Sequence, residues 1–338
     1  MGLRTGTSDS RPLAPMTDPS ILITDRIADE GLALLKEGGA HVDYAPGLPK
    51  DELLERIQHH DALIVRSETK VTRDLLERAT KLRIIGRAGV GVDNIDVTSA
   101  TEHRILVVNA PDGNTVAAAE HTIALLLGLA RQVAVAAASL ASGSWERSRF
   151  LGMQIRGKTL GIIGFGRIGR TVADIARNGL HMEVLAFDPY CAPSEMEERH
   201  ITPMRDLDSL LCSSDAVSLH VPLTADTTTL IGTEELHLMQ PHALLLNVAR
   251  GGLVDEEAVV AALDAGMLGG AAFDVFATEP LPQNSPLRTH PRILVTPHLG
   301  ASTHDAQRFV AIDVAEQVLR FLHGETPTSG VNLAEVLA

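Results

Sequence analysis

The chain has 338 residues, of which 45% are hydrophobic and 21% are charged, a composition typical of globular rather than disordered or fibrous proteins. Its formal charge of −14 and aromatic content of 3% argue against a nucleic acid as the main partner, because a phosphate backbone would repel the chain and few rings can stack on bases. The length predicts two domains.

Residues 1–20 are polar, contain proline and lack the apolar core of a signal peptide, so we expect a disordered extension there. The most apolar stretch, residues 122–130, is too short to cross a bilayer. Cys191 and Cys212 belong to no CxxC or Cys/His pattern, which predicts neither a disulfide framework nor a metal site. We therefore expect a cytoplasmic protein with no membrane partner.

From Ile21 onward, short β-branched apolar runs alternate with longer mixed segments, the pattern of a parallel sheet covered by helices on both faces. The first set of strands is predicted at residues 21–25, 61–65, 83–88 and 105–108. Helices are predicted between them at residues 30–37, 50–58 and 72–79.

An Ala- and Leu-rich stretch without proline then predicts one long helix over residues 114–140. A second set of strands is predicted at residues 159–164, 183–188, 215–220, 243–248, 269–276 and 292–297. A last helix is predicted over residues 302–323, where it could fold back onto the first set. The whole pattern predicts an α/β protein with two doubly wound parallel sheets.

The sequence GFGRIG at residues 164–169 is a GxGxxG motif between a predicted strand and a predicted helix. Gly164 allows a tight turn, Gly166 lets a pyrophosphate approach the backbone, and Gly169 lets the helix pack on the strand. Asp188 ends the next strand, where a carboxylate accepts hydrogen bonds from the ribose hydroxyls and repels a 2′-phosphate. The motif predicts NAD rather than NADP; a glycine-rich turn without a ligand is the alternative.

Three polar residues, Arg250, Glu279 and His298, follow strands of the second set, where open α/β sheets bind ligands. Moving a hydride from a hydroxyl carbon to nicotinamide requires a base for the hydroxyl proton, and histidine suits neutral pH. A neighbouring carboxylate orients the ring, and arginine binds a substrate carboxylate through two hydrogen bonds. This set predicts chemistry on a 2-hydroxy acid, although each residue alone could be structural or a surface residue.

Several segments, in this order along the chain, resemble the D-isomer-specific 2-hydroxyacid dehydrogenase family: SETKVTRDLLERA, GRAGVGVDNID, VVNAPDGNTVAAAEHTIALLL, GSWERSRFLGMQIRGKTLGIIGFGRIGR, HVPLTADT, NVARGGLVDE, FDVFATEP and TPHLGAST. The resemblance covers residues 21–332 and points to the phosphoglycerate branch. It implies a Rossmann NAD-binding domain over residues 114–300, with a dimerisation helix and arm at 114–155. That domain would be inserted into a flavodoxin-like substrate domain made of residues 21–113 and 301–332.

The resemblance also implies roles for individual residues. The catalytic set is Arg250, Glu279 and His298. Cofactor contacts are implied at Val90, Gly164, Gly166, Arg167, Ile168, Gly169, Asp188, Val221, Val248, Ala249, Arg250, Asp274, His298, Leu299, Gly300 and Ala301. Substrate contacts are implied at Arg66, Ser67, Lys70, Arg87, Gly89, Val90, Gly91 and Arg250, although the basic residues among them could be ordinary surface charge.

The activity implied is NAD-dependent oxidation of 3-phosphoglycerate to 3-phosphohydroxypyruvate, the first step of serine biosynthesis. The alternatives are a glyoxylate/hydroxypyruvate reductase, another D-2-hydroxyacid dehydrogenase, or, more remotely, an NAD-sensing dimeric corepressor-like protein. The family implies a homodimer and leaves open whether dimers pair into tetramers. Because the sequence ends at Ala338, we expect a short form without the C-terminal regulatory domain of longer members.

Overall fold

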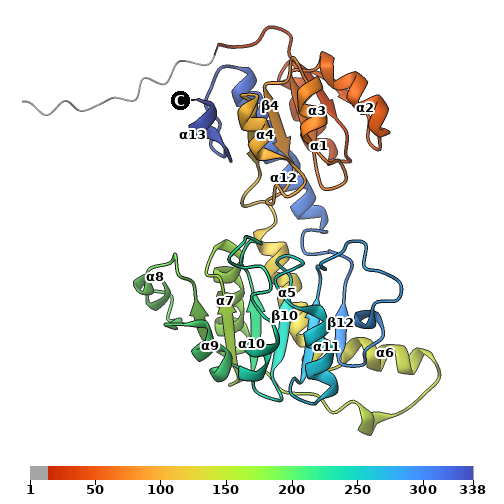
Figure 1. Ribbon diagram of the computed structural model, residues 1–338, viewed down its shortest axis with the longest axis vertical. Coiled ribbons are helices and arrows are strands. Elements are labelled where there is room, and N and C mark those ends of the chain that lie inside the picture. The colour runs from red at the N-terminus through yellow and green to blue at the C-terminus, as the bar shows by residue number, and fades with distance from the viewer. Residues whose placement is uncertain (1–13, 338) are drawn as a thin grey trace, which may run out of the picture. The chain divides into compact units, whose positions relative to one another are not determined.

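The computed structural model describes residues 14–337, which form two compact units (Figure 1). One comprises the residues up to Asn114 and those from Thr303 onward, and the other comprises Thr115–Ser302. Most of the predicted disordered extension, residues 1–13, lies outside the described residues. In the described part, the Met16 amide donates to the Leu322 carbonyl at 2.8 Å, and the Met16 side chain packs against the core. The extension expected to reach residue 20 is therefore anchored to the first unit from Met16 onward.

The first unit contains a parallel five-stranded sheet in the order β2-β1-β3-β4-β5. Its strands are β1 (Ser20–Ile23), β2 (His41–Tyr44), β3 (Ala62–Val65), β4 (Ile84–Arg87) and β5 (Leu106–Asn109). Because successive side chains alternate between faces, Ile21 and Ile23 pack in one core and Leu22 in another. Burial on both faces explains why these strands appear in the sequence as continuous apolar runs.

Helices cover both faces of this sheet. α1 (Asp29–Glu37) and α12 (His304–Leu322) pack together on one face, and α2 (Lys50–Arg56) and α3 (Arg73–Arg78) contribute to the core of the other. The unit also holds α4 (Val97–Glu102), α13 (Leu333–Val336) and a 3-10 turn at Ile57–His59. Since α12 contacts β4 and β5, both ends of the chain build this unit.

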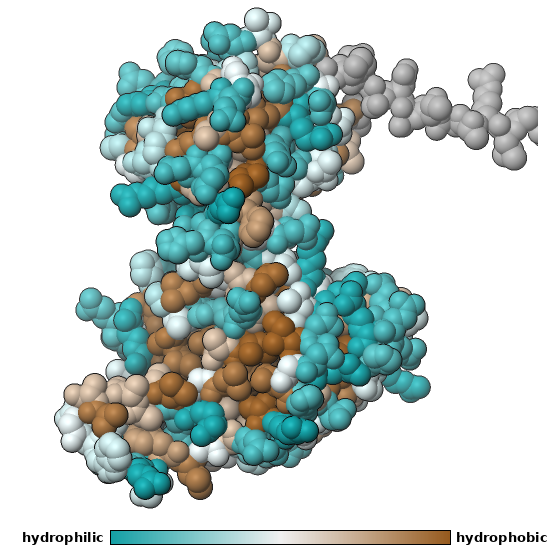
Figure 2. All heavy atoms as spheres, turned by 180° about the vertical axis from the view of Figure 1, so that it is seen from behind, coloured by the Kyte–Doolittle hydropathy of each residue, from teal (hydrophilic) through white to brown (hydrophobic). Residues whose placement is uncertain are grey.

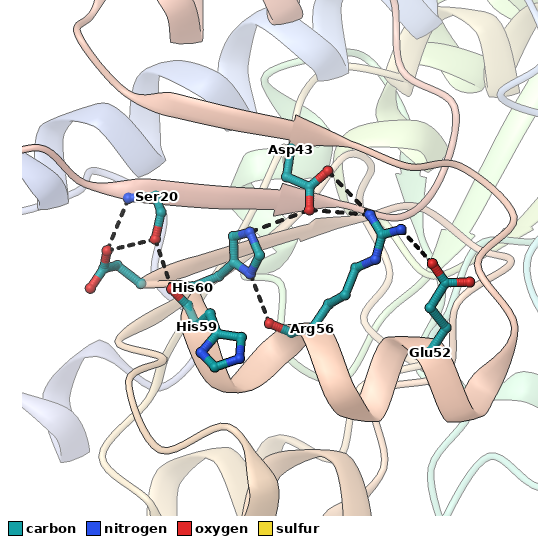
Figure 3. A network of polar contacts seen from close by, with 7 residues as sticks. Ser20, Asp43, Glu52, Arg56, His59 and His60 are labelled. Atoms are coloured by element: carbon teal, nitrogen blue, oxygen red, sulfur yellow. Dashed lines mark hydrogen bonds and ion pairs between the residues drawn. The ribbon is translucent and has the colours of Figure 1, made fainter.

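The edge strand β2 is absent from the sequence-based expectations. Its four residues are exposed or half-buried, so they form no apolar run. Polar contacts help to hold it in place: Arg56 Nη1 donates to Asp43 at 3.4 Å, and His60 Nε2 lies 3.5 Å from Asp43 Oδ2 (Figure 3). Arg56 also pairs with Glu52 on the same helix. The edge strand is thus tied to the end of α2 by charge, in addition to its pairing with β1 and the packing of half-buried Val42 on the core.

The second unit contains a parallel seven-stranded sheet in the order β12-β11-β10-β9-β6-β7-β8. Its strands are β6 (Thr159–Ile163), β7 (Glu183–Phe187), β8 (Thr202–Pro203), β9 (Ala216–Leu219), β10 (Leu244–Asn247), β11 (Gly270–Phe273) and β12 (Ile293–Val295). The order reverses between β6 and β9, which makes this the topological switch point where doubly wound sheets bind ligands. The predicted fold class, two doubly wound parallel sheets, is confirmed. The two-residue strand β8 is too short to be recognised from sequence.

The helices of the second unit also form two layers. α5 (Thr115–Ala130) and α7 (Arg167–Leu180) pack together, while α9 (Leu207–Ser213), α10 (Thr233–Leu238) and α11 (Glu256–Asp264) contribute to the opposite core. The shorter elements are α8 (Pro193–Glu197) and 3-10 turns at Arg147–Arg149 and Pro286–Arg288.

The prediction of one helix over residues 114–140 is wrong. α5 ends at Ala130, and α6 (Val133–Ala141) begins after Gln132, whose φ of 54° lies in the left-handed region. The two helices bend by 62° at this break, which contains neither glycine nor proline. In residues 14–337, no single helix is long and apolar enough to cross a membrane. Only α5 and α6 taken together, bent at this break, reach the length and apolar composition of such a helix.

Candidate active site

The residues predicted from the second set of strands lie at one edge of the sheet of the second unit. Each follows the carboxyl end of a different strand: Gly164 follows β6, Asp188 follows β7, Val221 follows β9, Arg250 follows β10, Asp274 follows β11 and His298 follows β12. Because every pairing in the sheet is parallel, these ends share one edge. The switch point lies between β6 and β9, and therefore between Gly164 and Val221.

The turn after β6 requires glycine at two positions and is open at a third. A Cβ on Gly164, whose φ is +93°, would lie 2.7 Å from the His220 carbonyl oxygen. A Cβ on Gly169 would lie 2.1 Å from the Gly164 carbonyl oxygen, so the helix could not approach the turn. At Gly166, by contrast, no atom of the described residues beyond its two chain neighbours would lie within 4 Å of a Cβ. The open space at Gly166 is where a bulky group could meet the backbone.

The helix that follows is suited to an anion. α7 starts after Gly166, with Arg167 and Ile168 as its first residues, and no side chain among the described residues caps it. Asp188 is fixed beside this turn, since its Oδ2 accepts the Phe165 amide and its Oδ1 the Tyr190 amide, each at 2.8 Å. A glycine turn, an uncapped helix N-terminus and a fixed carboxylate together fit a dinucleotide with its pyrophosphate on the helix and its ribose at Asp188.

The predicted pair of His298 and Glu279 is in contact. His298 Nδ1 lies 2.9 Å from Glu279 Oε2, and Glu279 Oε1 accepts the Phe276 amide at 3.1 Å. The carboxylate is therefore held by the backbone while it orients the imidazole. The side chain of His298 is 54% exposed, so the ring is accessible to a substrate.

Asp274 organises the turn that carries His298. Its side chain is 1% exposed; Oδ1 accepts the Thr296 hydroxyl at 2.6 Å and the Leu299 amide at 2.7 Å, and Oδ2 accepts the Gly300 amide at 2.8 Å. The Asp274 carbonyl accepts the His298 amide at 2.8 Å. These bonds hold His298 at a φ of 56°, a left-handed conformation that costs on the order of 1–3 kcal/mol outside glycine.

The charge of this carboxylate is maintained by its hydrogen bonds. Burial raises the pKa of Asp274, whereas bonds from His121, Thr296, Leu299 and Gly300 lower it, and the net effect lowers the pKa. Asp274 therefore stays ionised at neutral pH and acts on the turn as an anion.

Arg250 lies on a loop that packs against the loop of Glu279. A Cβ on the next residue, Gly251, would lie 1.8 Å from the Phe276 carbonyl oxygen, so the two backbones touch. Asn247 fixes the loop, since its Nδ2 donates to the Arg250 carbonyl at 2.8 Å. The guanidinium of Arg250 donates through Nη1 to the Ala249 carbonyl at 2.7 Å. The structure thus brings the loops of Arg250, Glu279 and His298 to one place.

The remaining predicted cofactor residues of this unit lie on the same edge. Val221 packs on the glycine turn, where its Cγ1 would lie 2.7 Å from a Cβ on Gly164. Val248 and Ala249 are half-buried between β10 and Arg250, and Ala301 is half-buried after the His298 turn. Among residues 14–337, no group of three His, Cys, Asp or Glu side chains is arranged to hold a metal ion.

The predicted substrate residues Arg66, Ser67 and Lys70 lie in the first unit, in the segment after β3. The 66–69 turn is fixed by Asp25, whose buried carboxylate accepts the amides of Arg66 at 2.6 Å and Thr69 at 3.1 Å. The Asn94 side chain donates to the Arg66 and Thr69 carbonyls at 2.9 and 2.7 Å. Lys70 lines a cavity of about 430 Å³ at this edge.

The neighbouring segment after β4 is also closely packed. Arg87 ends β4, and a Cβ on Gly89 would lie 1.5 Å from Arg87 Nη1, so any other residue there would displace this guanidinium and strain a backbone whose φ is +151°. The Val90 carbonyl accepts the Asn109 side chain at 2.6 Å, and Gly91 follows it, half-buried. The first unit therefore presents two arginines at the carboxyl ends of neighbouring strands: Arg66 follows β3 and Arg87 ends β4.

Sequence reasoning missed Asp25, Asn94, His121 and Thr296, each of which contacts a predicted site segment. His121 Nε2 lies 3.2 Å from Asp274 Oδ1, although the two residues are 153 positions apart in the chain. A single histidine within an Ala-rich helical stretch offers no local signal of such a contact. Thr296, in contrast, directly follows β12 and lies two residues before His298. Its position at a strand end could have identified it from the sequence as a candidate site residue.

Comparisons with known proteins agree with this geometry. Residues 123–300 match the family described as D-isomer specific 2-hydroxyacid dehydrogenase, NAD binding domain. The chain is 46% identical over 316 residues to D-3-phosphoglycerate dehydrogenase of Methanocaldococcus jannaschii, covering 94% of this chain and 60% of that protein. It is 48% identical over 327 residues to D-3-phosphoglycerate dehydrogenase 2, chloroplastic, of Arabidopsis thaliana, covering 96% and 52%.

A solved structure, the TT0316 protein from Thermus thermophilus, aligns with a TM-score of 0.85 and 38% identity, covering 92% of this chain and 99% of that one. The present chain spans only 60% and 52% of the two curated relatives, so each of them contains further sequence.

Proposed function

Because the chain belongs to the D-isomer specific 2-hydroxyacid dehydrogenase family, we propose that it oxidises a D-2-hydroxy acid to the 2-oxo acid with NAD, and that its substrate is 3-phosphoglycerate. The observation that carries the proposal is the contact of His298 with Glu279 at 2.9 Å, on the sheet edge that also holds the glycine turn and Arg250. The names of the two curated relatives support the choice of substrate.

In the proposed mechanism, Arg250 binds the substrate carboxylate and the C2 oxygen through its guanidinium. Neutral His298 accepts the hydroxyl proton at Nε2, and Glu279 at Nδ1 stabilises the imidazolium that forms. NAD, when bound, supplies the acceptor for the hydride. Since oxidation requires neutral His298 and reduction requires its protonated form, the two directions should show opposite trends with pH.

The residues around the glycine turn fit NAD. The backbone at Gly166 and the first turn of α7 would hold the pyrophosphate, and the carboxylate of Asp188 would accept the ribose hydroxyls. We assign Val221, Val248, Ala249, Leu299 and the 300–301 backbone to the surroundings of the nicotinamide and its ribose. The support is their position along the same edge, between the glycine turn and His298.

In the first unit, we assign Arg66, Ser67, Lys70 and Arg87 to the substrate phosphate, with residues 89–91 as backbone contacts. The support is chemical: arginine binds phosphate through paired hydrogen bonds, and Asp25 and Asn94 hold the 66–69 turn rigid before any ligand binds.

A turnover panel tests the function. 3-Phosphoglycerate, D-glycerate and lactate are each offered with NAD and with NADP, and glyoxylate with the reduced cofactors. We expect 3-phosphoglycerate with NAD to give the highest kcat/KM. A higher value for glyoxylate reduction would replace the proposed substrate, and no turnover in the whole panel would contradict the proposed activity.

We further propose that two copies form a homodimer through α6 and the segment that follows it. Four large apolar side chains are exposed there: Val133 at 55%, Leu140 at 57%, Trp145 at 78% and Leu151 at 88%. Figure 2 shows apolar residues gathered on the back of the second unit and on this projecting segment. Burying such a patch against a second copy removes apolar surface from water.

Light scattering tests this assembly. The wild type is expected at twice the chain mass, and the double variant Trp145→Glu with Leu151→Glu at the mass of one chain. Phe309→Glu, at an apolar side chain exposed elsewhere, is the control that should remain dimeric. A monomeric wild type would contradict the proposal, and a tetramer that falls to a monomer in the double variant would extend it.

A further inference from the structure

His121 of α5 contacts the buried carboxylate beneath the His298 turn, and neither the residue roles inferred from the sequence nor the proposed mechanism uses it. Its Nε2 lies 3.2 Å from Asp274 Oδ1 and 3.0 Å from Thr296 Oγ1. The His121 side chain is 18% exposed and that of Asp274 1%, so the contact is shielded from solvent. A polar contact of this kind in a buried place requires matched donors and acceptors.

The partners determine which way the hydrogen bonds run. The ionised carboxylate of Asp274 can only accept, and the Thr296 hydroxyl already donates its proton to Asp274 Oδ1 at 2.6 Å. Nε2 of His121 must therefore carry a hydrogen, which it shares between the carboxylate and the hydroxyl oxygen. His121 acts here as a donor in either protonation state.

This donor connects to His298 through a short chain of bonds. Asp274 Oδ1, which receives His121, also accepts the Leu299 amide at 2.7 Å, and Oδ2 accepts the Gly300 amide at 2.8 Å. The Asp274 carbonyl accepts the His298 amide at 2.8 Å. His298 keeps its left-handed backbone only while these bonds fix the turn, because a residue other than glycine does not favour that conformation.

We propose that His121 is a positioning residue for His298. By donating from Nε2 to Asp274 and Thr296, it fixes the rotamer of the Asp274 carboxylate and so holds the 298–300 turn in which the His298 ring meets Glu279. This inference rests on the proposed role of His298 in proton transfer. Within the described residues, the polar contacts of His121 reach the turn through Asp274 and Thr296, so its effect on His298 is indirect.

Two variants separate the donor from the bulk of the ring. His121→Leu removes the donor, whereas His121→Gln presents an amide N–H at similar reach. We expect His121→Leu to lower kcat by up to about 100-fold, since misplacing a reacting group by about 1 Å can cost that much. His121→Gln should recover most of that loss. The dissociation constant of NAD should change far less than kcat in both variants, because the 298–301 turn borders only the nicotinamide end, whereas the glycine turn and Asp188 follow other strands.

His237→Leu is the matched control, because His237 also lies on a helix of the second unit but its ring bonds to the Thr233 carbonyl of its own helix. Thermal unfolding of all variants is recorded so that kinetics are compared only among folded proteins. Wild-type kcat in a folded His121→Leu variant would overturn the proposal. So would a His121→Gln variant that folds and is as slow as His121→Leu.

A spectroscopic readout keeps this test separate from the proposed function. In histidine-labelled protein, the NMR signals of the His298 ring should shift or broaden in His121→Leu and remain at their wild-type positions in His121→Gln and His237→Leu. If the wild type turned over no substrate, the proposed function would fail, but the ring signals would still decide whether His121 positions His298. Unchanged His298 signals in His121→Leu would overturn the positioning role.

Discussion

Each unit of this protein uses a buried aspartate after one strand to hold the turn after a neighbouring strand. In the first unit, Asp25 follows β1 and holds the turn after β3; in the second, Asp274 follows β11 and holds the turn after β12. Both aspartates are 1% exposed. In both places a carboxylate satisfies backbone amides that would otherwise be unpaired in a tight turn.

The two aspartates differ in their other donors. Asp25 accepts backbone amides and the Thr69 hydroxyl, whereas Asp274 also receives the imidazole of His121. The turn at Asp25 presents side chains, such as that of Arg66, whose proposed role is to bind an anion and which take no part in proton transfer. The turn at Asp274 presents His298 in a costly backbone conformation and, in the proposed mechanism, moves a proton. Damage to the first turn should therefore act on KM, and damage to the second on kcat.

The largest expected effect comes from the proton-transfer residue itself. His298→Ala should lower kcat about 10²- to 10⁴-fold, because it removes the general base while leaving the glycine turn intact. Steady-state rates and calorimetric titration with NAD measure the two quantities. A variant with near-normal kcat, or one whose loss is explained by weaker NAD binding, would show that His298 is not the base.

Asp274→Asn should have the next largest effect, a fall in kcat of up to about 100-fold, because the reacting His298 would be misplaced. The amide nitrogen of asparagine would face a backbone N–H, either of Leu299 or of Gly300, so the His298 turn would loosen. Asp215→Asn is the control: this carboxylate holds Lys158 and His242 at the opposite edge of the same sheet. Equal kcat in the two variants would show that the turn held by Asp274 does not support kcat.

Asp25→Asn should act on binding instead. Loss of one acceptor for the 66–69 turn should raise the KM for 3-phosphoglycerate roughly tenfold, with little change in kcat. D-glycerate, which has no phosphate, should keep its KM. The control Asp61→Asn alters a carboxylate that holds Ser20 at 2.9 Å in the same sheet and should change neither value. A fall in kcat with unchanged KM would reverse the comparison.

The smallest effect concerns acid stability. Because the folded protein holds the pKa of Asp274 below its ordinary value, its ionised form contributes stability above the unfolded-state pKa, and that contribution is lost as pH falls through the folded-state pKa. Urea unfolding of wild type and Asp274→Asn should therefore differ most at neutral pH and converge in acid. A difference that grows on acidification would contradict the direction of the shift.

Much of the fold could be predicted because both sheets are buried on both faces. Strands such as β3 and β10 are apolar throughout or nearly so, which makes them visible in the sequence. The half-exposed edge strand β2 and the two-residue strand β8 lack that signal. The break at Gln132 escaped prediction because the left-handed residue there is neither glycine nor asparagine.

The residues of the candidate site likewise fall into those that the sequence predicted and those that it did not. The glycine turn and the strand-end residues Arg250, Glu279 and His298 were predicted because short local patterns carry them, and the structure places Glu279 against His298. His121 was missed because its contact with Asp274 depends on how α5 packs against the sheet. Tertiary packing of this kind leaves no trace in the spacing of neighbouring residues.

The division between the units is tested most directly by the double variant Arg66→Ala with Lys70→Ala. Its kcat and KM are measured with NAD, first on 3-phosphoglycerate and then on D-glycerate. We expect the KM for 3-phosphoglycerate to rise strongly while both constants for D-glycerate stay at their wild-type values, since the chemistry of the second unit is untouched. An equal loss on both substrates, or an unchanged KM for 3-phosphoglycerate, would contradict the assignment of phosphate recognition to the first unit.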